Sequence, residues 1–266
     1  MRIALFQKDL VWGDPAANCQ SVAGMLGLTR GQVDLVVLPE MFSTGFATEP
    51  EGIAEEAPAS SLEFMKSIAV DLDAAVAGSI ALHEGGRYFN RFFFVKPDGV
   101  VEFYDKRHLF TYGGEDKRFT AGSKRTVVQW RGVRFLLQVC YDLRFPVWSR
   151  NSLAPSCSAA GALVPDFDAI LYVASWPSVR RAAWDTLLRA RAIENQCFVC
   201  GVNRVGSDPS NEYNGGTAFV DPLGAVQVAA PDSEEAVVVC DLDMAGLEAF
   251  RAKFPVLADA DKFVLR

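Results

Sequence analysis

Histidine is the scarcest catalytic residue type in this sequence. Among 266 residues, only His83 and His108 occur. A zinc site built on several histidines, such as the HExxH motif, is therefore excluded. A Ser-His-Asp triad could use only one of the two, and no GxSxG motif accompanies either. An enzyme with this composition is expected to use a carboxylate or a lysine as its general base.

An excess of positive charge is also missing. The chain has 26 Lys+Arg against 33 Asp+Glu, which gives a net charge of −7 at pH 7. Proteins that bind nucleic acid usually present a basic stripe, so this balance argues against a nucleic-acid partner. No apolar run approaches the roughly 20 residues that span a bilayer, so we expect no membrane partner either.

Signals for secretion are lacking as well. The stretch MRIALFQKDLVWGD reaches acidic and turn residues early and has no small-residue cleavage site. We therefore expect no signal peptide and a cytoplasmic location. Cysteines scattered through such a chain are expected to be free thiols rather than a disulfide framework. The six are Cys19, Cys140, Cys157, Cys197, Cys200 and Cys240.

Short β-rich runs alternate with helical stretches from end to end. RIALFQ is typical of a strand, and DLVVLPE is a continuous apolar run typical of a strand buried on both faces. Helices are expected over residues 14–28, with Asp14 as the cap, and over residues 178–196. A third helix is expected through LEFMKSIAVDL, capped by Ser60 or Ser61.

Turn signals and the absence of a linker complete the organisation. Residues 97–99 (Pro-Asp-Gly) and 131–132 (Arg-Gly) predict two β-hairpins. The stretch Ser152–Pro165 is rich in small and polar residues and predicts a long surface loop. No composition break divides the chain, so we expect one α/β domain over residues 1–266, with helices outside packed sheets.

Three strand ends each deliver one reactive group. DLVVLPE ends in Glu40, VVEFYDK ends in Lys106 and RFLLQVC ends in Cys140. A buried strand that finishes on a charged or nucleophilic residue places it at the sheet edge, where a pocket can open. Each has a plain alternative: a solvated loop glutamate, a surface lysine and a buried structural cysteine. Their joint occurrence on comparable strand ends favours shared chemistry.

Four segments carry a resemblance to a known family. LPEMFSTGF, YDKRHLFTYGGEDKRFTAG, CYDLRFPVWSRN and NRVGSD…NEYNGGTAFVDPLG occur in the order in which similar motifs occur in the nitrilase (carbon–nitrogen hydrolase) superfamily. The second and third segments are most similar to the bacterial omega-amidase group, whose typical substrate is 2-oxoglutaramate. The resemblance implies a four-layer αββα sandwich, a Glu-Lys-Cys triad and no cofactor.

The roles that the resemblance implies agree with the chemistry of amide hydrolysis. Cys140 would attack the carbonyl carbon and form an acyl-enzyme. Glu40 would take the thiol proton and later activate water. Lys106 and the backbone N–H of Tyr141 would stabilise the oxyanion. Glu115 matches an additional glutamate of the family that positions the substrate amide or the lysine; its alternative is a solvated loop acid.

Substrate contacts are expected from three further residues. Arg144 matches an arginine that binds the substrate carboxylate in related carbamoyl-amino-acid hydrolases, and a guanidinium fork suits a carboxylate. The alternative is a structural ion pair with Asp142 or another acid. Trp176 and Tyr112 are candidates for the pocket wall, although large aromatic residues near strand ends are commonly core.

Other motifs are interpreted as structural. The CxxC at Cys197 and Cys200 lies in a strand-like run where positions three apart face opposite ways, so we expect no metal site. Pairing of Arg191 with Glu194 favours a solvated or interface face on the helix over residues 178–196. His108 is expected to be a structural hydrogen-bonding residue.

The predicted function is a thiol amidohydrolase that converts a small carboxylated ω-amide and water to an acid and ammonia. The alternatives on the same fold are an N-carbamoyl amino acid hydrolase and a nitrilase. A catalytically silent binding module is a further alternative, against which the intact triad counts. In the omega-amidase group the connection at Ser152–Pro165 is usually shorter, which bears on substrate identity. By resemblance we expect a homodimer that pairs near Trp148–Asn151 and the helix over residues 178–196.

Overall fold

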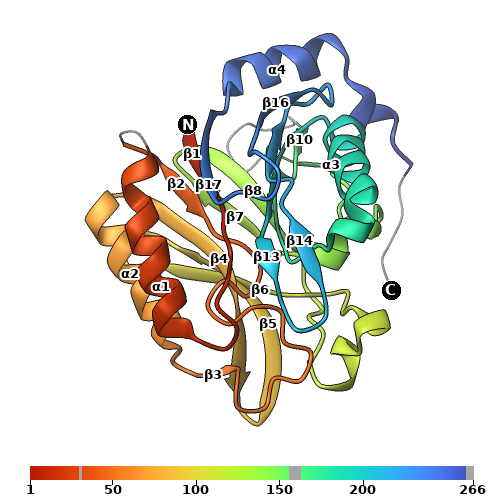
Figure 1. The fold of residues 1–266 in the computed structure, drawn as a ribbon. Coiled ribbons are helices and arrows are strands. Elements are labelled where there is room, and N and C mark those ends of the chain that lie inside the picture. Colours follow the sequence, from red (N-terminus) through yellow and green to blue (C-terminus); the bar gives the residue numbers. More distant parts are fainter. Residues whose placement is uncertain (30–31, 156–162, 262–266) are drawn as a thin grey trace.

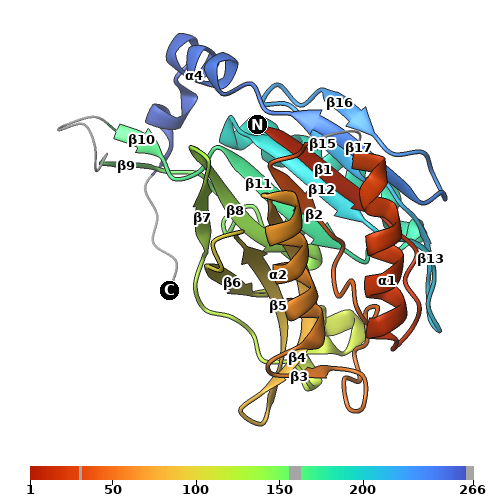
Figure 2. The same ribbon diagram turned by 90° about the vertical axis from the view of Figure 1, so that its left-hand side faces the viewer.

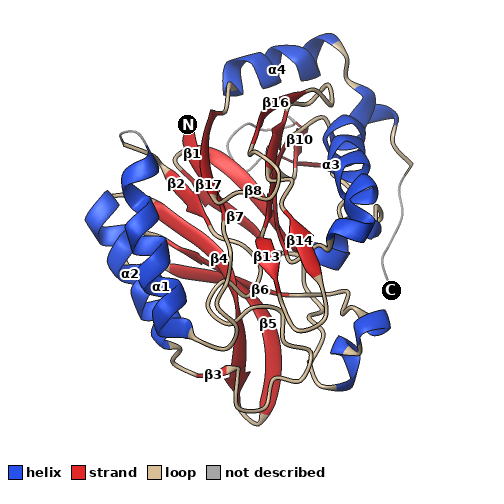
Figure 3. Cartoon of the chain, viewed as in Figure 1, coloured by secondary structure: helices blue, strands red, loops and turns tan. Residues whose placement is uncertain are grey.

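Two β-sheets pack face to face in a computed structural model that describes residues 1–29, 32–155 and 163–261. Helices α1 and α2 cover the outer face of one sheet, and α3 covers the outer face of the other (Figures 1 and 2). This arrangement is the four-layer αββα sandwich that the family resemblance implies, and the strands form its two inner layers (Figure 3).

The first sheet has the strand order β17-β1-β2-β4-β5-β6, with β3 pairing alongside β4. Its strands are β1 (Arg2–Gln7), β2 (Leu35–Val37), β3 (Glu55–Glu56), β4 (Ala75–Glu84), β5 (Arg87–Val95), β6 (Val101–Asp105) and β17 (Ala236–Asp241). Strands β1, β2 and β4 are parallel, and β5 and β6 each reverse direction. Strand β6 therefore runs the same way as β2, and both end at one edge.

The second sheet has the strand order β16-β15-β12-β11-β8-β7. Its strands are β7 (Val127–Trp130), β8 (Val133–Val139), β11 (Ala169–Ala174), β12 (Phe198–Asn203), β15 (Ala218–Val220) and β16 (Val226–Ala229). The central strands β8, β11 and β12 are parallel. The predicted hairpin between β7 and β8 forms because Arg131 (φ 43°) and Gly132 (φ 84°) both adopt the left-handed conformation of a tight hairpin turn.

The inner faces of the sheets share one hydrophobic core. Leu5 and Phe94 come from the first sheet and Phe135 and Leu171 from the second, all fully buried. The rings of Phe94 and Phe135 lie 6.1 Å apart across the sheets. Burying each such side chain contributes roughly 1.5–3 kcal/mol, so the contact between the sheets stabilises the fold.

Helices cover the outer faces through their own apolar sides. They are α1 (Pro15–Met25), α2 (Ser60–Leu72), α3 (Arg181–Asn195) and α4 (Met244–Lys253), with 3₁₀ turns η1 (Leu26–Thr29), η2 (Thr111–Gly113), η3 (Glu115–Lys117), η4 (Cys140–Arg144), η5 (Ser178–Arg180) and η6 (Val256–Asp259). Trp184 and Leu188 of α3 are buried against β12. A Cβ at Gly201 of β12 would lie 2.5 Å from Leu188 Cδ1, so only glycine permits this close approach.

Helix starts were predicted correctly at one position and wrongly at another. Asp14 caps α1, because its carboxylate accepts the Ala17 N–H at 2.9 Å. Neither Ser60 nor Ser61 caps α2 through its own side chain. Instead the Glu55 carboxylate, from β3, accepts the Ser61 N–H and the Ser60 hydroxyl, each at 2.9 Å. A residue outside the helix thus takes the role predicted for the serines.

Two further expectations need correction. Strands β9 (Leu153–Pro155) and β10 (Leu163–Pro165) form an antiparallel pair, so the predicted loop is partly β-structure; residues 156–162, with Cys157, lie outside the described residues. The small strands β13 (Val205–Ser207) and β14 (Glu212–Asn214) form another pair.

Arg191 does not lie on a solvated face. It is buried and donates to the Leu143 carbonyl oxygen at 2.6 Å as well as to Glu194.

Over the three described ranges, no helix has the length and apolar character needed to cross a membrane.

Candidate active site

Glu40 lies in the turn that follows β2 and is fully buried. Its Oε1 accepts from Lys106 Nζ at 2.9 Å and from Asn90 Nδ2 at 2.8 Å. Its Oε2 accepts the backbone N–H of Ser175, at the end of β11 in the other sheet, at 2.8 Å. The carboxylate therefore joins the two sheets and has a fixed orientation.

Lys106 directly follows β6 and is also fully buried. Besides Glu40, its Nζ contacts Glu115, with Oε2 at 2.8 Å and Oε1 at 3.1 Å. Glu115 in turn accepts the Phe110 N–H at 2.6 Å. Asn90 Nδ2 also donates to Glu115 at 3.1 Å, so one amide bridges both carboxylates. Glu115 is thus a buried member of the cluster and not a solvated loop acid.

The electrostatics of this cluster depend on burial and on its mutual charges. Burial lowers the pKa of Lys106, but the Glu115 and Glu40 carboxylates outweigh it and raise the pKa above its ordinary value. The ammonium is therefore charged at any physiological pH. Burial raises the pKa of Glu115, and the neighbouring Lys106 ammonium lowers it. Because the Glu40 carboxyl group also raises it, the pKa of Glu115 lies above its ordinary value.

Cys140 stands at the carboxyl end of β8, where the chain enters η4. Its φ of 45° is left-handed, a strained conformation for a non-glycine residue that turns the side chain out of the strand direction. Asp142 stabilises this turn by accepting the Val139 N–H at 3.0 Å. Burial, and then the Glu40 charge, raise the pKa of the Cys140 thiol well above its ordinary value, against the effect of Lys106. The raised pKa favours the thiol form of Cys140, and the Glu40 side chain lies beside it.

Cys140 opens into a narrow cavity of about 30 Å³. Its wall is largely aromatic, and two guanidinium groups line it: Arg144 lies over the Trp176 ring at 4.9 Å, and Arg180 over the Phe110 ring at 5.4 Å. The remaining lining residues are Phe46, Tyr141, Ser175, Pro177, Asn211 and Tyr213. Trp176 thus lines this cavity.

Two contacts considered from the sequence, Tyr112 in the pocket wall and an Arg144–Asp142 ion pair, are not found at the cavity that Cys140 lines. Tyr112 is 86% exposed and does not line the cavity at Cys140. It lines an outer cavity of about 770 Å³, which shares Phe46, Phe110, Arg180 and Asn211 with the inner one. Asp142 does not pair with Arg144 among the described residues, because its oxygens accept from Val139, Tyr104 and His108.

The residues interpreted as structural are placed as follows. His108 Nδ1 lies 2.7 Å from Asp142 Oδ1, a structural hydrogen bond as predicted. Cys197 and Cys200 are buried free thiols. Within residues 1–29, 32–155 and 163–261, no group of His, Cys, Asp and Glu side chains is arranged to hold a metal ion.

Sequence reasoning missed Asn90, Ser175 and Arg180. Asn90 had a local signal, because an amide in the middle of the aromatic strand RYFNRFFFV has to find a partner in the core. Ser175 and Arg180 had none, because a serine and an arginine in a loop are commonplace.

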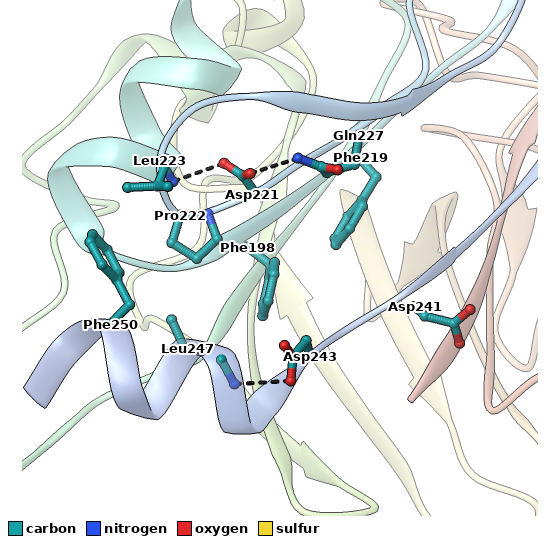
Figure 4. A pocket seen from close by; sticks show the side chains of 11 residues that line it. Phe198, Phe219, Asp221, Pro222, Leu223, Gln227, Asp241, Asp243, Leu247 and Phe250 are labelled. Atoms are coloured by element: carbon teal, nitrogen blue, oxygen red, sulfur yellow. Dashed lines mark hydrogen bonds between the residues drawn. The ribbon is translucent and has the colours of Figure 1, made fainter.

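A separate pocket of about 390 Å³, away from both cavities described above, lies between α4 and strands β15 and β16 (Figure 4). Its floor is apolar, with the rings of Phe198 and Phe219 stacked at 5.4 Å. Its Asp221 accepts from the backbone of its own turn and from Gln227, and Asp243 caps α4 through Gly246. Its described lining residues include no cysteine, serine, threonine or lysine, whereas the cavity at Cys140 contains a thiol.

Comparison with known proteins agrees with this geometry. Residues 2–252 match the carbon–nitrogen hydrolase family, and the chain belongs to that family. The omega-amidase YafV of Yersinia enterocolitica is 44% identical, over 100% of this chain and 98% of its own. A 2-oxoglutaramate amidase of Bacillus subtilis (strain 168) is 31% identical, over 98% and 97%. The crystal structure of XC1258 from Xanthomonas campestris, a CN-hydrolase superfamily protein with an arsenic adduct in its active site, matches with a TM-score of 0.94 and 45% identity, over 100% and 99%.

Proposed function

We propose that this protein is a thiol amidohydrolase that cleaves the terminal amide of a small carboxylated ω-amide, such as 2-oxoglutaramate, to the acid and ammonia. Membership of the carbon–nitrogen hydrolase family and relatives named for amidase activity support the reaction class. The observation that carries the proposal is that Cys140, which lines the cavity, lies beside the buried cluster of Glu40, Lys106 and Glu115.

Acylation begins with proton transfer from the Cys140 thiol to Glu40, which is next to it in the cluster. The sulfur attacks the amide carbonyl carbon as the C=O bond becomes a C–O⁻ single bond. Lys106 and the backbone N–H of Tyr141 stabilise this oxyanion, and such donors are typically worth about 3–4 kcal/mol each. Collapse of the tetrahedral intermediate breaks the C–N bond, and Glu40 returns the proton to the departing nitrogen, which leaves as ammonia.

Deacylation repeats the proton transfers with water. Glu40 removes a proton from water, the resulting hydroxide attacks the thioester carbon, and the C–S bond breaks. The thiolate recovers the proton from Glu40 and the product acid is released. Glu115 forms a second ion pair with Lys106 beside that of Glu40, which makes it a positioning residue.

Arg144 is proposed to bind the substrate carboxylate. Its guanidinium lies over Trp176 in the same cavity as Cys140 and has no described carboxylate partner. Binding at the remote end of the substrate aligns the scissile amide with the sulfur, which converts binding energy into rate.

Ammonia release from a matched panel tests the function. Glutaramate and 2-oxoglutaramate are expected to be hydrolysed faster than pentanamide, the corresponding nitrile and an N-carbamoyl amino acid. Cys140→Ala is expected to abolish turnover with an unchanged circular dichroism spectrum, because the covalent route is lost while little packing is removed. Cys197→Ala, a buried cysteine outside the site, is the matched control and retains turnover. Activity of Cys140→Ala above a few per cent of wild type would contradict the proposal.

Three broader features belong to the same proposal. The chain over residues 1–266 is proposed to act as one domain, since both sheets contribute to one core and one site. It is proposed to act in the cytoplasm, consistent with its free thiols. It is proposed to form a homodimer near Trp148–Asn151 and α3.

A further inference from the structure

Arg180 stands where the inner cavity at Cys140 meets the outer cavity. It ends η5, directly before α3, and its side chain lines both cavities. Its guanidinium lies over the Phe110 ring, 5.4 Å from the centroid. A substrate that enters from the outer cavity passes this group before it reaches the sulfur.

The backbone of Arg180 is held in place by the residue on which Arg144 lies. Trp176 Nε1 donates to the Arg180 carbonyl oxygen at 2.8 Å, and the Arg180 N–H donates to Pro177 at 3.0 Å. The Trp176 ring also supports the Arg144 guanidinium at 4.9 Å. One indole therefore fixes the positions of two cations on the wall of one narrow cavity.

Neither cation is neutralised within the described part of the chain. Arg144 and Arg180 form no ion pair or side-chain hydrogen bond with a described residue, and most of the other charged groups of the site are paired below them in the buried cluster. Stacking covers a face of each guanidinium and leaves its N–H edge available. Two guanidinium edges beside an aromatic wall suit a ligand group with several acceptor lone pairs and a negative charge.

We propose that Arg180 binds the carboxylate of the ω-amide substrate together with Arg144, and that it is a specificity-determining residue. An ionised carboxylate offers about four acceptor sites on two oxygens, so it can accept from two guanidinium groups at once. This inference rests on the proposed function and adds the second half of the carboxylate site. It also explains why the cavity carries two unpaired arginines where one would bind a carboxylate.

A matched pair of amides tests the inference. Glutaramate and pentanamide each have five carbons and differ in the terminal carboxylate. Arg180→Met is expected to lower kcat/KM for glutaramate at least tenfold more than kcat/KM for pentanamide, mainly through a higher KM. Arg180→Lys, which keeps a charge without the planar fork, is expected to recover part of the preference. Arg144→Met, measured on the same pair, is expected to show a loss of the same kind.

Arg87→Met is the control. Arg87 also lies over a phenylalanine ring, that of Phe89 at 5.3 Å, but it lines neither cavity, so the ratio for the two amides is expected to stay at the wild-type value. Equal losses of Arg180→Met on both amides, or no loss on either, would overturn the role of Arg180 while the wild-type preference for glutaramate still supports the function. A wild-type enzyme without that preference would instead overturn the proposed function.

Discussion

Reactivity at this site depends on charges that are held out of water. Glu40, Lys106 and Glu115 are each fully buried, which would be prohibitive for any one of them alone. They are tolerated because every oxygen of Glu40 and Glu115 has a donor: Lys106, Asn90, Ser175 or Phe110. The same network holds Glu40 beside the Cys140 thiol, so the proton transfer proposed between them needs no rearrangement of solvent.

Removal of the base or of the cation tests the cluster. Glu40→Gln and Lys106→Met are each expected to lower kcat at least about 10²-fold, the usual scale for a general base or an oxyanion group. The double variant is expected to be little worse than either single variant, because the groups act as one unit. The measurement is kcat for glutaramate hydrolysis, with circular dichroism to check folding.

Glu63 and Lys66 provide the control for these substitutions. They form an exposed ion pair on α2, with Lys66 Nζ 2.7 Å from Glu63 Oε1. Neither residue lines the inner or the outer cavity. Glu63→Gln and Lys66→Met are expected to leave kcat at the wild-type value. Losses in Glu40→Gln and Lys106→Met that multiply in the double variant would mean that the two residues do not share one site.

Secondary-structure elements position the site through their ends. Strands β2, β6, β8 and β11 run toward one edge, and reactive residues follow where each strand stops. At the opposite end of β11 from Ser175, Asp168 connects other elements. Its carboxylate, directly before β11, accepts from Arg134 of β8 at 2.7 Å and from Arg251 of α4 at 2.8 Å.

Asp168→Asn is expected to reduce stability in a pH-dependent way. Burial raises the pKa of this carboxyl, but the hydrogen bonds and charges of Arg134 and Arg251 outweigh it and lower the pKa. A lowered folded-state pKa stabilises the fold above the unfolded value of about 3.9, and this stabilisation is lost as pH falls through the folded value. The substitution is therefore expected to cost about 2 kcal/mol at pH 7 and less below about pH 4.

Urea denaturation at both pH values measures the change. Asp73→Asn is the control, because Asp73 pairs with Arg131 while 71% exposed and should change the free energy of unfolding by less than about 1 kcal/mol. A cost of Asp168→Asn that is the same at pH 7 and pH 3.5 would show that the carboxylate charge does not link α4 to the sheet.

At the scale of the whole molecule, the sandwich leaves apolar side chains exposed near the proposed dimer contact. Trp184 and Leu188 of α3 do not serve it, because both are buried in the core. Val147 and Val179 remain exposed, at 49% and 82%, next to the segments named for pairing. Exposed apolar groups of this kind are candidates for the contact between two copies.

Light scattering at micromolar concentration is expected to give twice the 29.0 kDa mass of one chain. Val147→Glu places a charge in the proposed contact and is expected to shift the population toward the monomer. Val70→Glu is the control, because Val70 is 63% exposed on α2, which covers the other outer face (Figure 1). A wild-type monomer would refute the dimer.

Local patterns in the sequence determined which elements form and which residues end the strands. Apolar runs, a capping aspartate and a glycine turn act over a few neighbouring residues, so β1, α1 and the β7–β8 hairpin were predicted from them. The same patterns placed Glu40, Lys106 and Cys140 at strand ends, although their catalytic roles remain proposals. The family resemblance, and not periodicity, supplied the pairing of the two sheets into a sandwich, which the family match and the XC1258 structure confirm.

Only the tertiary structure decided which side chains share an environment. Asn90 lies 50 positions from Glu40 in the sequence, and Ser175 lies 135 positions from Glu40. No local sequence pattern carries information over such separations. Burial also depends on what packs opposite a residue, so Arg191 on an otherwise amphipathic helix is inside, and Tyr112 beside the site is outside. Arg180 has an ordinary sequence context. It lines the cavity at Cys140 because η5 places it over the Phe110 ring, and a pocket is formed by surfaces that meet only when the chain folds.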